Sequence, residues 1–314
     1  MSGGNKLISV VVSVYNEETA IKLFYERADR ILGTCAWDHE IIFVNDGSRD
    51  ASLPILEKIA ASDKKVKVIS FSRNFGHEAA MIAGVDYAKG DGIICMDADL
   101  QHPPEKIPEI IVQFDAGYDV VTLVRTKNRD AGIFKRITSS VFYRLMNKMS
   151  PVEFKENASD FIAVSKRAAD VLRNDYREKA RFLRGYVQLV GFNKTSIEYA
   201  AASRVAGKSK YNLKKLTQTS FYAMCSFSDM PLRLGIYAGV ITAAAGFIIM
   251  IYTIVNKIIN GAPAGYSTIL VVLCFMFAAT LVIIGIIGEY LAVLLVETKA
   301  RPIYIVEKIV NEDE

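Results

Sequence analysis

The feature that most constrains this chain is a pair of long uncharged segments in its last third. Leu234–Val255 and Tyr266–Ile287 each contain 22 residues without a charged side chain. As α-helices they would each be about 33 Å long, enough to cross a hydrocarbon core of about 30 Å. The short segment Asn256–Gly265 contains Gly and Pro and predicts a turn, and therefore an antiparallel hairpin. The alternative is a pair of buried core helices, but a soluble core rarely offers two such segments with so short a link. We predict transmembrane helices at 234–255 and 266–288, within 232–297.

The basic residues around the hairpin predict its orientation. Three of them precede the first helix, three follow the second, and one lies in the turn: Lys214, Lys215, Arg233, then Lys299, Arg301, Lys308, and Lys257 in the turn. The positive-inside rule therefore places both ends in the cytoplasm. Because Met1–Lys6 is short and polar, with no signal-peptide pattern, we expect a multi-pass protein of the inner or plasma membrane.

The segments on either side of the hairpin are expected to be cytoplasmic as well. Apolar residues recur at near-helical spacing in 212–231, which predicts a helix in the membrane interface or one packed on the soluble domain. Residues 298–314 are predicted to form a cytoplasmic tail.

Residues 1–211 predict a soluble α/β domain of alternating strands and helices. The expected strands are Leu7–Val14, Glu40–Asn45, Val66–Ser70, Gly92–Met96 and Asp119–Thr122, and the expected helices are Glu18–Leu32, Ser52–Ser62, Glu78–Lys89 and Glu105–Ala116. Continuous apolar strands alternating with helices are typical of a mostly parallel, Rossmann-like sheet with helices on both faces. The four cysteines show no CxxC spacing, so we expect neither a zinc site nor disulfides. A net charge of +4 is too small to suggest a nucleic-acid partner.

Polar residues follow three of the predicted strands directly. The first strand ends in Tyr15-Asn16-Glu17, the second in Asn45-Asp46-Gly47-Ser48, and the fourth in Asp97-Ala98-Asp99. In open α/β sheets ligands bind at the carboxyl ends of the strands. Each cluster alone could be ordinary turn chemistry, but their conjunction predicts one site at one sheet edge.

The chain has no glycine-rich phosphate loop of either common kind. A diphosphate could instead be held by a metal ion bound to Asp97 and Asp99, which lie two apart on a segment expected to be extended. Gln101 lies two residues after Asp99, so on an extended segment its side chain would be on the same side and could add a neutral oxygen ligand to the metal ion. His102 could be a further ligand. Oxygen ligands favour Mg²⁺ or Mn²⁺ over zinc or copper.

Several blocks of the sequence together resemble a known family. They are Val11–Glu18, Val44–Ser48, Met96–Pro104, Phe142–Leu145, Ser159–Phe161, Phe182–Gly185, Arg204–Tyr211, Gly288–Tyr290 and Lys299–Tyr304. In this order they are similar to the signatures of family 2 glycosyltransferases with the GT-A fold, over nearly the whole chain. The likeness is to the polyprenyl-phosphate branch, which includes dolichyl-phosphate mannose synthase and the bactoprenol glucosyltransferase type.

The resemblance implies a role for each matching residue. Tyr15, Asn16, Glu17, Asp46, Asp97 and Arg184 would bind the nucleotide and sugar, and Asp97, Asp99 and Gln101 the metal ion. Asp160 and Asp99 would be the catalytic carboxylates. Arg125, Arg129, Arg136, Arg204, Lys208 and Lys210 would contact the diphosphate or the acceptor phosphate, with Lys135 a further candidate.

The implied activity is transfer of a sugar, with inversion, from a nucleotide donor to undecaprenyl or another polyprenyl phosphate. The acceptor phosphate is already mostly dianionic at neutral pH, so Asp160 is expected to orient substrates as much as to take a proton. The alternative is that Asp160 caps a helix starting at Lys166, but a position six residues upstream is too distant for a helix cap. By analogy with relatives, a homo-oligomer is expected.

The donor sugar stays open. UDP-glucose leads, and UDP-N-acetylglucosamine, UDP-galactose and GDP-mannose remain alternatives. Many relatives have Gly-Asp-Phe where this chain has Ser159-Asp160-Phe161, and many carry tryptophan where it has Tyr186–Phe192.

Three rival functions fit the sequence less well. A processive polysaccharide synthase would carry a Gln-x-x-Arg-Trp block, but the single tryptophan here is Trp37. An inactive membrane scaffold of this fold would be expected to lack the acidic clusters. A channel subunit would need ionisable residues inside its spans.

Overall fold

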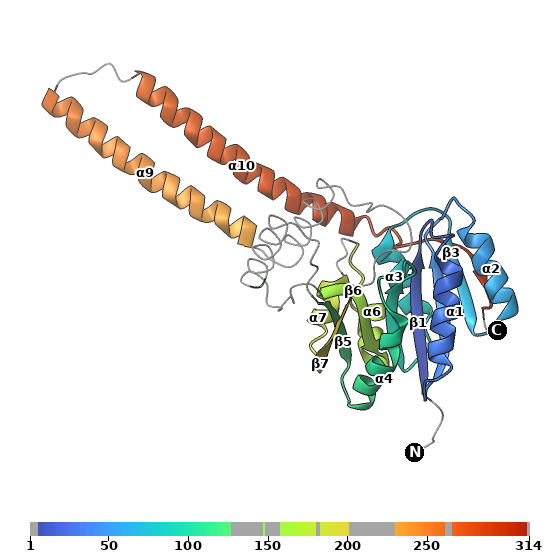
Figure 1. Cartoon of the computed structure of the whole chain (residues 1–314). Coiled ribbons are helices and arrows are strands. Elements are labelled where there is room, and N and C mark those ends of the chain that lie inside the picture. The colour runs from blue at the N-terminus through green and yellow to red at the C-terminus, as the bar shows by residue number, and fades with distance from the viewer. Residues whose placement is uncertain are drawn as a thin grey trace. The chain divides into compact units, whose positions relative to one another are not determined.

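A computed structural model describes residues 6–126, 147, 158–179, 183–200, 230–260 and 266–312. The chain forms two compact units (Figure 1). Unit 1 comprises Met1–Tyr211 together with Arg301–Glu314, and unit 2 comprises Asn212–Ala300.

The described part of unit 1 contains one sheet with the strand order β7-β5-β6-β4-β1-β2-β3-β8. The strands are β1 (Leu7–Val14), β2 (Asp38–Asn45), β3 (Val66–Phe71), β4 (Gly92–Asp97), β5 (Val120–Arg125), β6 (Ala158–Ser165), β7 (Lys194–Tyr199) and β8 (Val306–Val310). Strands β1 to β4 are parallel to one another, and β5 is parallel to β7. Since β6 is antiparallel to both β4 and β5, strands β1 to β5 and β7 all point the same way. Strand β6 runs in the opposite direction, and so does β8, which is antiparallel to β3.

Helices cover both faces of this sheet. They are α1 (Ile21–Leu32), α2 (Ser52–Ser62), α3 (His77–Tyr87), the short 3₁₀ helix η1 (Pro104–Lys106), α4 (Ile107–Asp115), α6 (Lys166–Asn174) and α7 (Leu183–Leu189). Helix α1 packs with α2 and α4, whereas α3 packs with α6, which in turn packs with α7.

Alternating side chains of β1 show which helices cover which face. Ile8, Val10, Val12 and Val14 are buried in one core cluster with residues of α1, α2 and α4. Val11 points the other way, towards α3, where a Cβ atom on Gly84 would lie 2.0 Å from its Cγ1 atom. Glycine at position 84 therefore permits the close approach of α3 to the sheet.

The predicted α/β fold is confirmed, and the first five strands fall where the sequence places them, to within three residues at either end. The sequence analysis did not identify β6, β7 or β8. Of these, β8 matters most, because it lies in 298–314, which was expected to be only a tail. Strand β8 instead pairs with β3, and Arg301–Glu314 belongs to unit 1.

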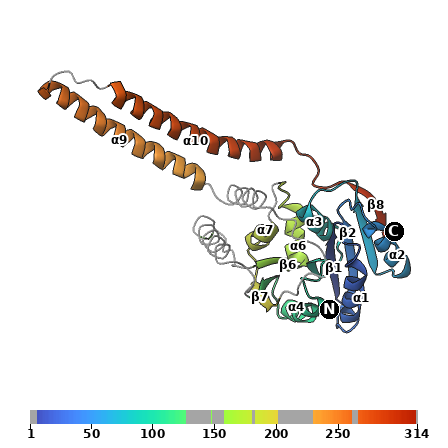
Figure 2. The same cartoon turned by 45° about the horizontal axis from the view of Figure 1, so that its top comes forward.

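Unit 2 contains two long apolar helices, α9 (Met230–Asn260) and α10 (Tyr266–Thr298). They pack on each other and lie side by side in both views (Figures 1 and 2). Their most apolar windows, Gly235–Tyr252 and Phe275–Thr298, are long and apolar enough to cross a membrane and are almost wholly exposed. They are therefore not core helices of unit 1. Residues 212–229, which include most of the predicted interfacial segment, lie outside the described residues.

Candidate active site

The three polar turns predicted from the sequence lie at one edge of the sheet, because β1, β2 and β4 are adjacent and parallel. The first two turns are joined by hydrogen bonds. The Asn16 backbone N–H donates to Ser48 Oγ (3.0 Å), the Arg49 backbone N–H donates to Asn16 Oδ1 (2.8 Å), and the Glu17 backbone N–H donates to Ser52 Oγ (3.0 Å). Asn16 adopts a left-handed backbone conformation (φ 54°), and Tyr15 beside it is partly buried.

Asp46, predicted to bind the nucleotide, lies beneath the connection between β3 and α3. Its side chain accepts hydrogen bonds from the Phe75 backbone N–H (2.6 Å), the Gly76 backbone N–H (2.9 Å) and Asn74 Nδ2 (2.8 Å). Burial raises the pKa of Asp46, although the two backbone N–H donors act in the opposite direction. Asp46 thus shapes the connection that borders the predicted nucleotide site.

The fourth strand ends at Asp97, and the chain turns immediately afterwards. Leu100 has a positive φ of 62°, and the Gln101 backbone N–H donates to Asp99 Oδ1 (3.0 Å). The expectation of an extended segment from Asp97 to Gln101 is therefore wrong. The spacing of two residues no longer implies that Gln101 and Asp99 lie on the same side of the segment. A short carboxylate that bonds the backbone two residues ahead stabilises this kind of turn.

His102 is not placed as a metal ligand. It is fully buried, and its Nδ1 atom accepts a hydrogen bond from the Asp97 backbone N–H (3.0 Å). Burial lowers its pKa, which favours the neutral ring. The imidazole therefore fastens the Asp97 turn to the core, where it stacks on Phe161 with ring centroids 5.1 Å apart.

The carboxylates of Asp97 and Asp99 fit a divalent cation that takes its other ligands from a diphosphate. Among the described residues no group of three or more His, Cys, Asp or Glu side chains could hold a metal ion. The Asp97 side chain is partly exposed, while Asp99 is 8% exposed. Mg²⁺ typically binds one or two protein carboxylates and takes its remaining ligands from water and substrate phosphates. Asp97 and Asp99 suit that arrangement.

Asp160 reaches the same sheet edge from an antiparallel strand. Ala158 pairs with Val124 near the end of β5, and Ile162 pairs with Cys95 near the end of β4, so β6 begins where its neighbours end. The helix-cap alternative is excluded, because α6 is capped by the side chain of Ser165. Sequence periodicity did not reveal this placement.

Arg184, at the start of α7, forms a two-pronged ion pair with Asp160. Its Nε atom donates to Oδ1 (2.5 Å) and its Nη2 atom to Oδ2 (2.9 Å). Burial alone would raise the pKa of Asp160, but Arg184 and the nearby His77 hold it well below its usual range. Asp160 is therefore ionised, and both of its carboxylate oxygens accept hydrogen bonds from Arg184.

The sequence alone assigns no role to His77, which the structure places beside the predicted carboxylates. As the first residue of α3, it lies between the two key carboxylates. Its Nδ1 atom is 3.5 Å from Asp97 Oδ1 and 2.8 Å from Ser13 Oγ, and its Nε2 atom is 3.9 Å from Asp160 Oδ2. Burial lowers the pKa of His77, but the two carboxylates outweigh burial and raise it. His77 directly follows the connection after β3. The rule that ligands bind at the carboxyl ends of the strands could therefore have identified it.

Arg125, predicted to face a phosphate, ends β5 at the same edge. Its Nε atom donates to Tyr199 Oη (2.9 Å), and its Nη2 atom lies 3.5 Å from His102 Nε2. The structure thus brings Arg125 close to the Asp97 turn. The other predicted phosphate contacts, Arg129, Lys135, Arg136, Arg204, Lys208 and Lys210, lie outside the described residues.

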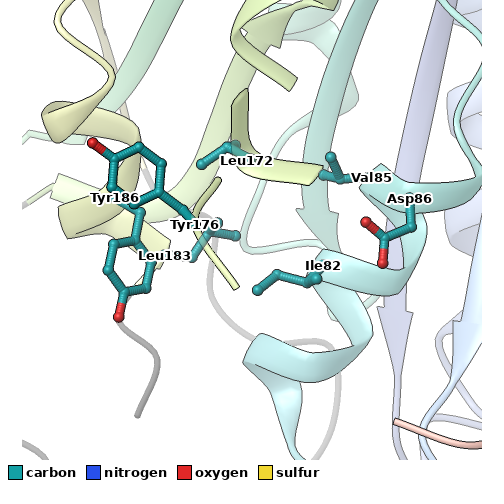
Figure 3. Close-up of a pocket in the computed structure, with 7 residues that line it drawn as sticks. All are labelled: Ile82, Val85, Asp86, Leu172, Tyr176, Leu183 and Tyr186. Carbon is teal, nitrogen blue, oxygen red and sulfur yellow. The ribbon is translucent and has the colours of Figure 1, made fainter. Parts of the chain in front are cut away.

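A small pocket lies elsewhere, between α3 and the α6–α7 region (Figure 3). Its lining is mainly apolar and aromatic and includes Asp86: Ile82, Val85, Asp86, Leu172, Tyr176, Leu183 and Tyr186. None of the predicted site residues lines it. The candidate site is therefore the carboxylate cluster at the sheet edge.

The mixed α/β sheet, with paired aspartates at the end of β4 and an Arg-bound aspartate on β6, agrees with the GT-A glycosyltransferase fold that the sequence resembles. The model of "Glycosyl transferase family 2" matches residues 9–173. The chain belongs to this family and is a glycosyltransferase.

Relatives match over nearly the whole chain, including the apolar hairpin. A prophage bactoprenol glucosyl transferase homolog of Escherichia coli (strain K12) is 40% identical over 305 residues, covering 96% of this chain and 99% of the relative. The bactoprenol glucosyl transferase of Shigella phage SfII is 39% identical and covers 96% of this chain and 97% of its own. Among solved structures, a Mycobacterium tuberculosis glucosyl-3-phosphoglycerate synthase superposes with a TM-score of 0.47 at 18% identity, covering 70% of this chain and 78% of that one. A likeness this distant says nothing about substrates.

Proposed function

We propose that this protein transfers a sugar from a nucleotide donor to the phosphate of a polyprenyl lipid such as undecaprenyl phosphate, and that it does so with inversion. The product would be a lipid-linked sugar that serves in modification of cell-envelope glycans. The observation that carries the proposal is the match, over 96% of the chain, to proteins named bactoprenol glucosyl transferase. The carboxylate cluster and the two apolar helices supply the two parts that such a reaction needs.

The proposed topology follows from the basic residues. We assign 1–211 to a cytoplasmic catalytic domain, 212–231 to an interfacial segment, and 232–297 to the membrane hairpin. Residues 298–314 return to the cytoplasmic side, which agrees with the pairing of β8 and β3 in unit 1.

The donor site would be formed around the ends of β1, β2 and β4. Asp97 and Asp99 would hold Mg²⁺ or Mn²⁺, which neutralises the charge that develops on the departing diphosphate. Arg125 and Arg184 place guanidinium groups near the same edge, and guanidinium groups suit phosphate oxygens. The roles of Tyr15, Asn16, Glu17 and Asp46 at the nucleotide, and that of Gln101 at the metal ion, remain predictions.

The acceptor needs little base catalysis. A phosphate monoester with a second pKa of about 6 is mostly dianionic at neutral pH. Asp160 is already paired with Arg184, so its carboxylate is better suited to orienting the sugar than to taking a proton. Among donors UDP-glucose fits the relatives' names, with UDP-N-acetylglucosamine, UDP-galactose and GDP-mannose as alternatives.

A transfer assay with a donor panel tests the proposal. The purified full-length protein in detergent is incubated with undecaprenyl phosphate, Mn²⁺ or Mg²⁺, and each of the four nucleotide sugars. Mass spectrometry should detect a lipid whose mass has increased by one hexose when UDP-glucose is the donor. If no donor gives a lipid product, the proposal is wrong, and a product from another donor alone would correct the sugar.

A further inference from the structure

The segment that follows the second apolar helix is built into unit 1. Strand β8 pairs antiparallel with β3, and the Ser72 backbone N–H donates to the Ile305 carbonyl (3.0 Å), just beyond the end of β3. The Lys299–Tyr304 block was one of the blocks that carried the family resemblance, yet the proposed mechanism gives it no task.

Tyr304 contacts two elements that lead to the site. Its ring is stacked on Phe71, the last residue of β3, with centroids 5.1 Å apart and planes 11° apart. Its hydroxyl donates to Asp86 Oδ2 on α3 (2.7 Å). Burial and this hydrogen bond raise the pKa of Tyr304, so the hydroxyl remains a donor throughout the physiological range.

Asp86 is held from a second side as well. Arg177, which follows α6, donates from Nη1 to Oδ1 (2.8 Å) and from Nη2 to Oδ2 (3.1 Å). Figure 3 shows Asp86 on α3 at the wall of the pocket between α3 and the α6–α7 region. Tyr304 and Arg177 together fasten the C-terminal end of α3, the helix whose first residue is His77.

The connection between β3 and α3 links Tyr304 to Asp46, the residue predicted to bind the nucleotide. Phe71, under Tyr304, meets Phe75 edge to face with centroids 5.7 Å apart. Phe75 and Gly76 donate their backbone N–H groups to Asp46. A chain of direct contacts therefore runs from Tyr304 through Phe71 and Phe75 to Asp46.

We propose that the post-helix segment Arg301–Val310 is a positioning element of the donor-nucleotide half of the site. Tyr304 acts through the β3–α3 connection and α3, and through them it sets the positions of Asp46 and His77. The inference rests on the proposed function, because it takes the edge beside Asp46 as the nucleotide subsite. It assigns a positioning role to a residue more than 200 positions away from that subsite along the chain.

The same segment offers a matched control. Lys308 lies on β8 but pairs with Glu57 of α2 (2.7 Å) and does not contact the β3–α3 connection or α3 in any described interaction. A change at Lys308 therefore perturbs the attachment of β8 without touching the chain of contacts from Tyr304.

The test compares Tyr304→Phe, Tyr304→Ala and Lys308→Ala in the full-length protein in detergent. UDP affinity in the presence of Mn²⁺ is measured by calorimetry, and amide exchange is followed in peptides covering 72–80. Tyr304→Phe removes one hydrogen bond to a charged group and should weaken UDP binding by about fivefold, with faster exchange in 72–80. Tyr304→Ala also removes the ring contact and should have a larger effect, while Lys308→Ala should match the unchanged protein.

The proposal is overturned if Tyr304→Phe leaves both UDP affinity and exchange in 72–80 unchanged, even if its melting temperature falls. Equal effects of Lys308→Ala and Tyr304→Phe would also overturn it, since they would indicate general loosening of β8. Because Tyr304→Phe keeps the ring, it carries the test if Tyr304→Ala fails to fold. A protein that binds UDP but transfers no sugar to lipid would count against the proposed function alone.

Discussion

Asp160 shows how the surroundings of one carboxylate define its chemistry. Two hydrogen bonds from Arg184 occupy its oxygens, and His77 lies 3.9 Å from Oδ2. A general base near neutral pH would need a pKa close to 7, whereas the pKa of Asp160 is held below its usual range. The carboxylate is therefore charged at every pH at which the protein would work.

We expect Asp160→Asn to lower kcat by about 100-fold, because the amide no longer provides the charge that pairs with Arg184 and faces the sugar. The loss should not recover between pH 6 and 9. Initial rates of lipid glycosylation over this range measure it. Asp115→Asn, which alters an exposed ion pair with Lys6 at the end of α4, is the matched control and should be silent. Rescue of Asp160→Asn at high pH would show that Asp160 acts as a base.

His77 bridges the two carboxylates, so its removal should leave like charges facing each other across an empty space. We expect His77→Ala to reduce kcat by about tenfold or more, because a small displacement of reacting groups is costly. Steady-state kinetics measures the effect. His39→Ala serves as the control, because His39 lies at the opposite end of β2 from the site. Equal kcat values for the two variants would contradict the bridging role.

At the scale of elements, the close approach of α3 to the sheet positions His77. We expect Gly84→Ala to destabilise unit 1 by about 1–3 kcal/mol, because the added methyl group would overlap buried Val11. Thermal unfolding measures the change. Gly33→Ala, at the end of α1, meets only ordinary contacts of 3.4 Å or more and should have little effect. A stable Gly84→Ala variant would show that α3 can move away without penalty.

The sequence was sufficient to predict β1 to β5 because these strands are apolar and short, and the first four are followed by helices. It was not sufficient for β6 and β8. Their places depend on pairing with strands distant along the chain, β6 with β4 and β8 with β3. The site divides in the same way: Asp46, Asp97 and Asp99 follow recognisable strands, whereas the pairing of Asp160 with Arg184 and the position of His77 required the tertiary structure.

At the scale of the whole molecule, the two apolar helices and the return of the chain into unit 1 predict a single topology. In a variant whose native cysteines are replaced, Asn260→Cys should react with a membrane-impermeant thiol reagent on intact cells. Glu312→Cys should react only after the membrane is opened. These residues lie at the end of α9 and beyond β8. Labelling of both cysteines on intact cells would contradict the proposed orientation.

The central claim is that the nucleophile is a lipid phosphate and not a hydroxyl group. The most direct measurement compares undecaprenyl phosphate with undecaprenol as acceptors for the full-length protein, with UDP-glucose and Mn²⁺, and weighs the lipid products. The account predicts a hexose-bearing phosphodiester from the phosphate and no product from the alcohol, because the dianion needs no base while the hydroxyl does. Glucosylation of the alcohol at a comparable rate would contradict it.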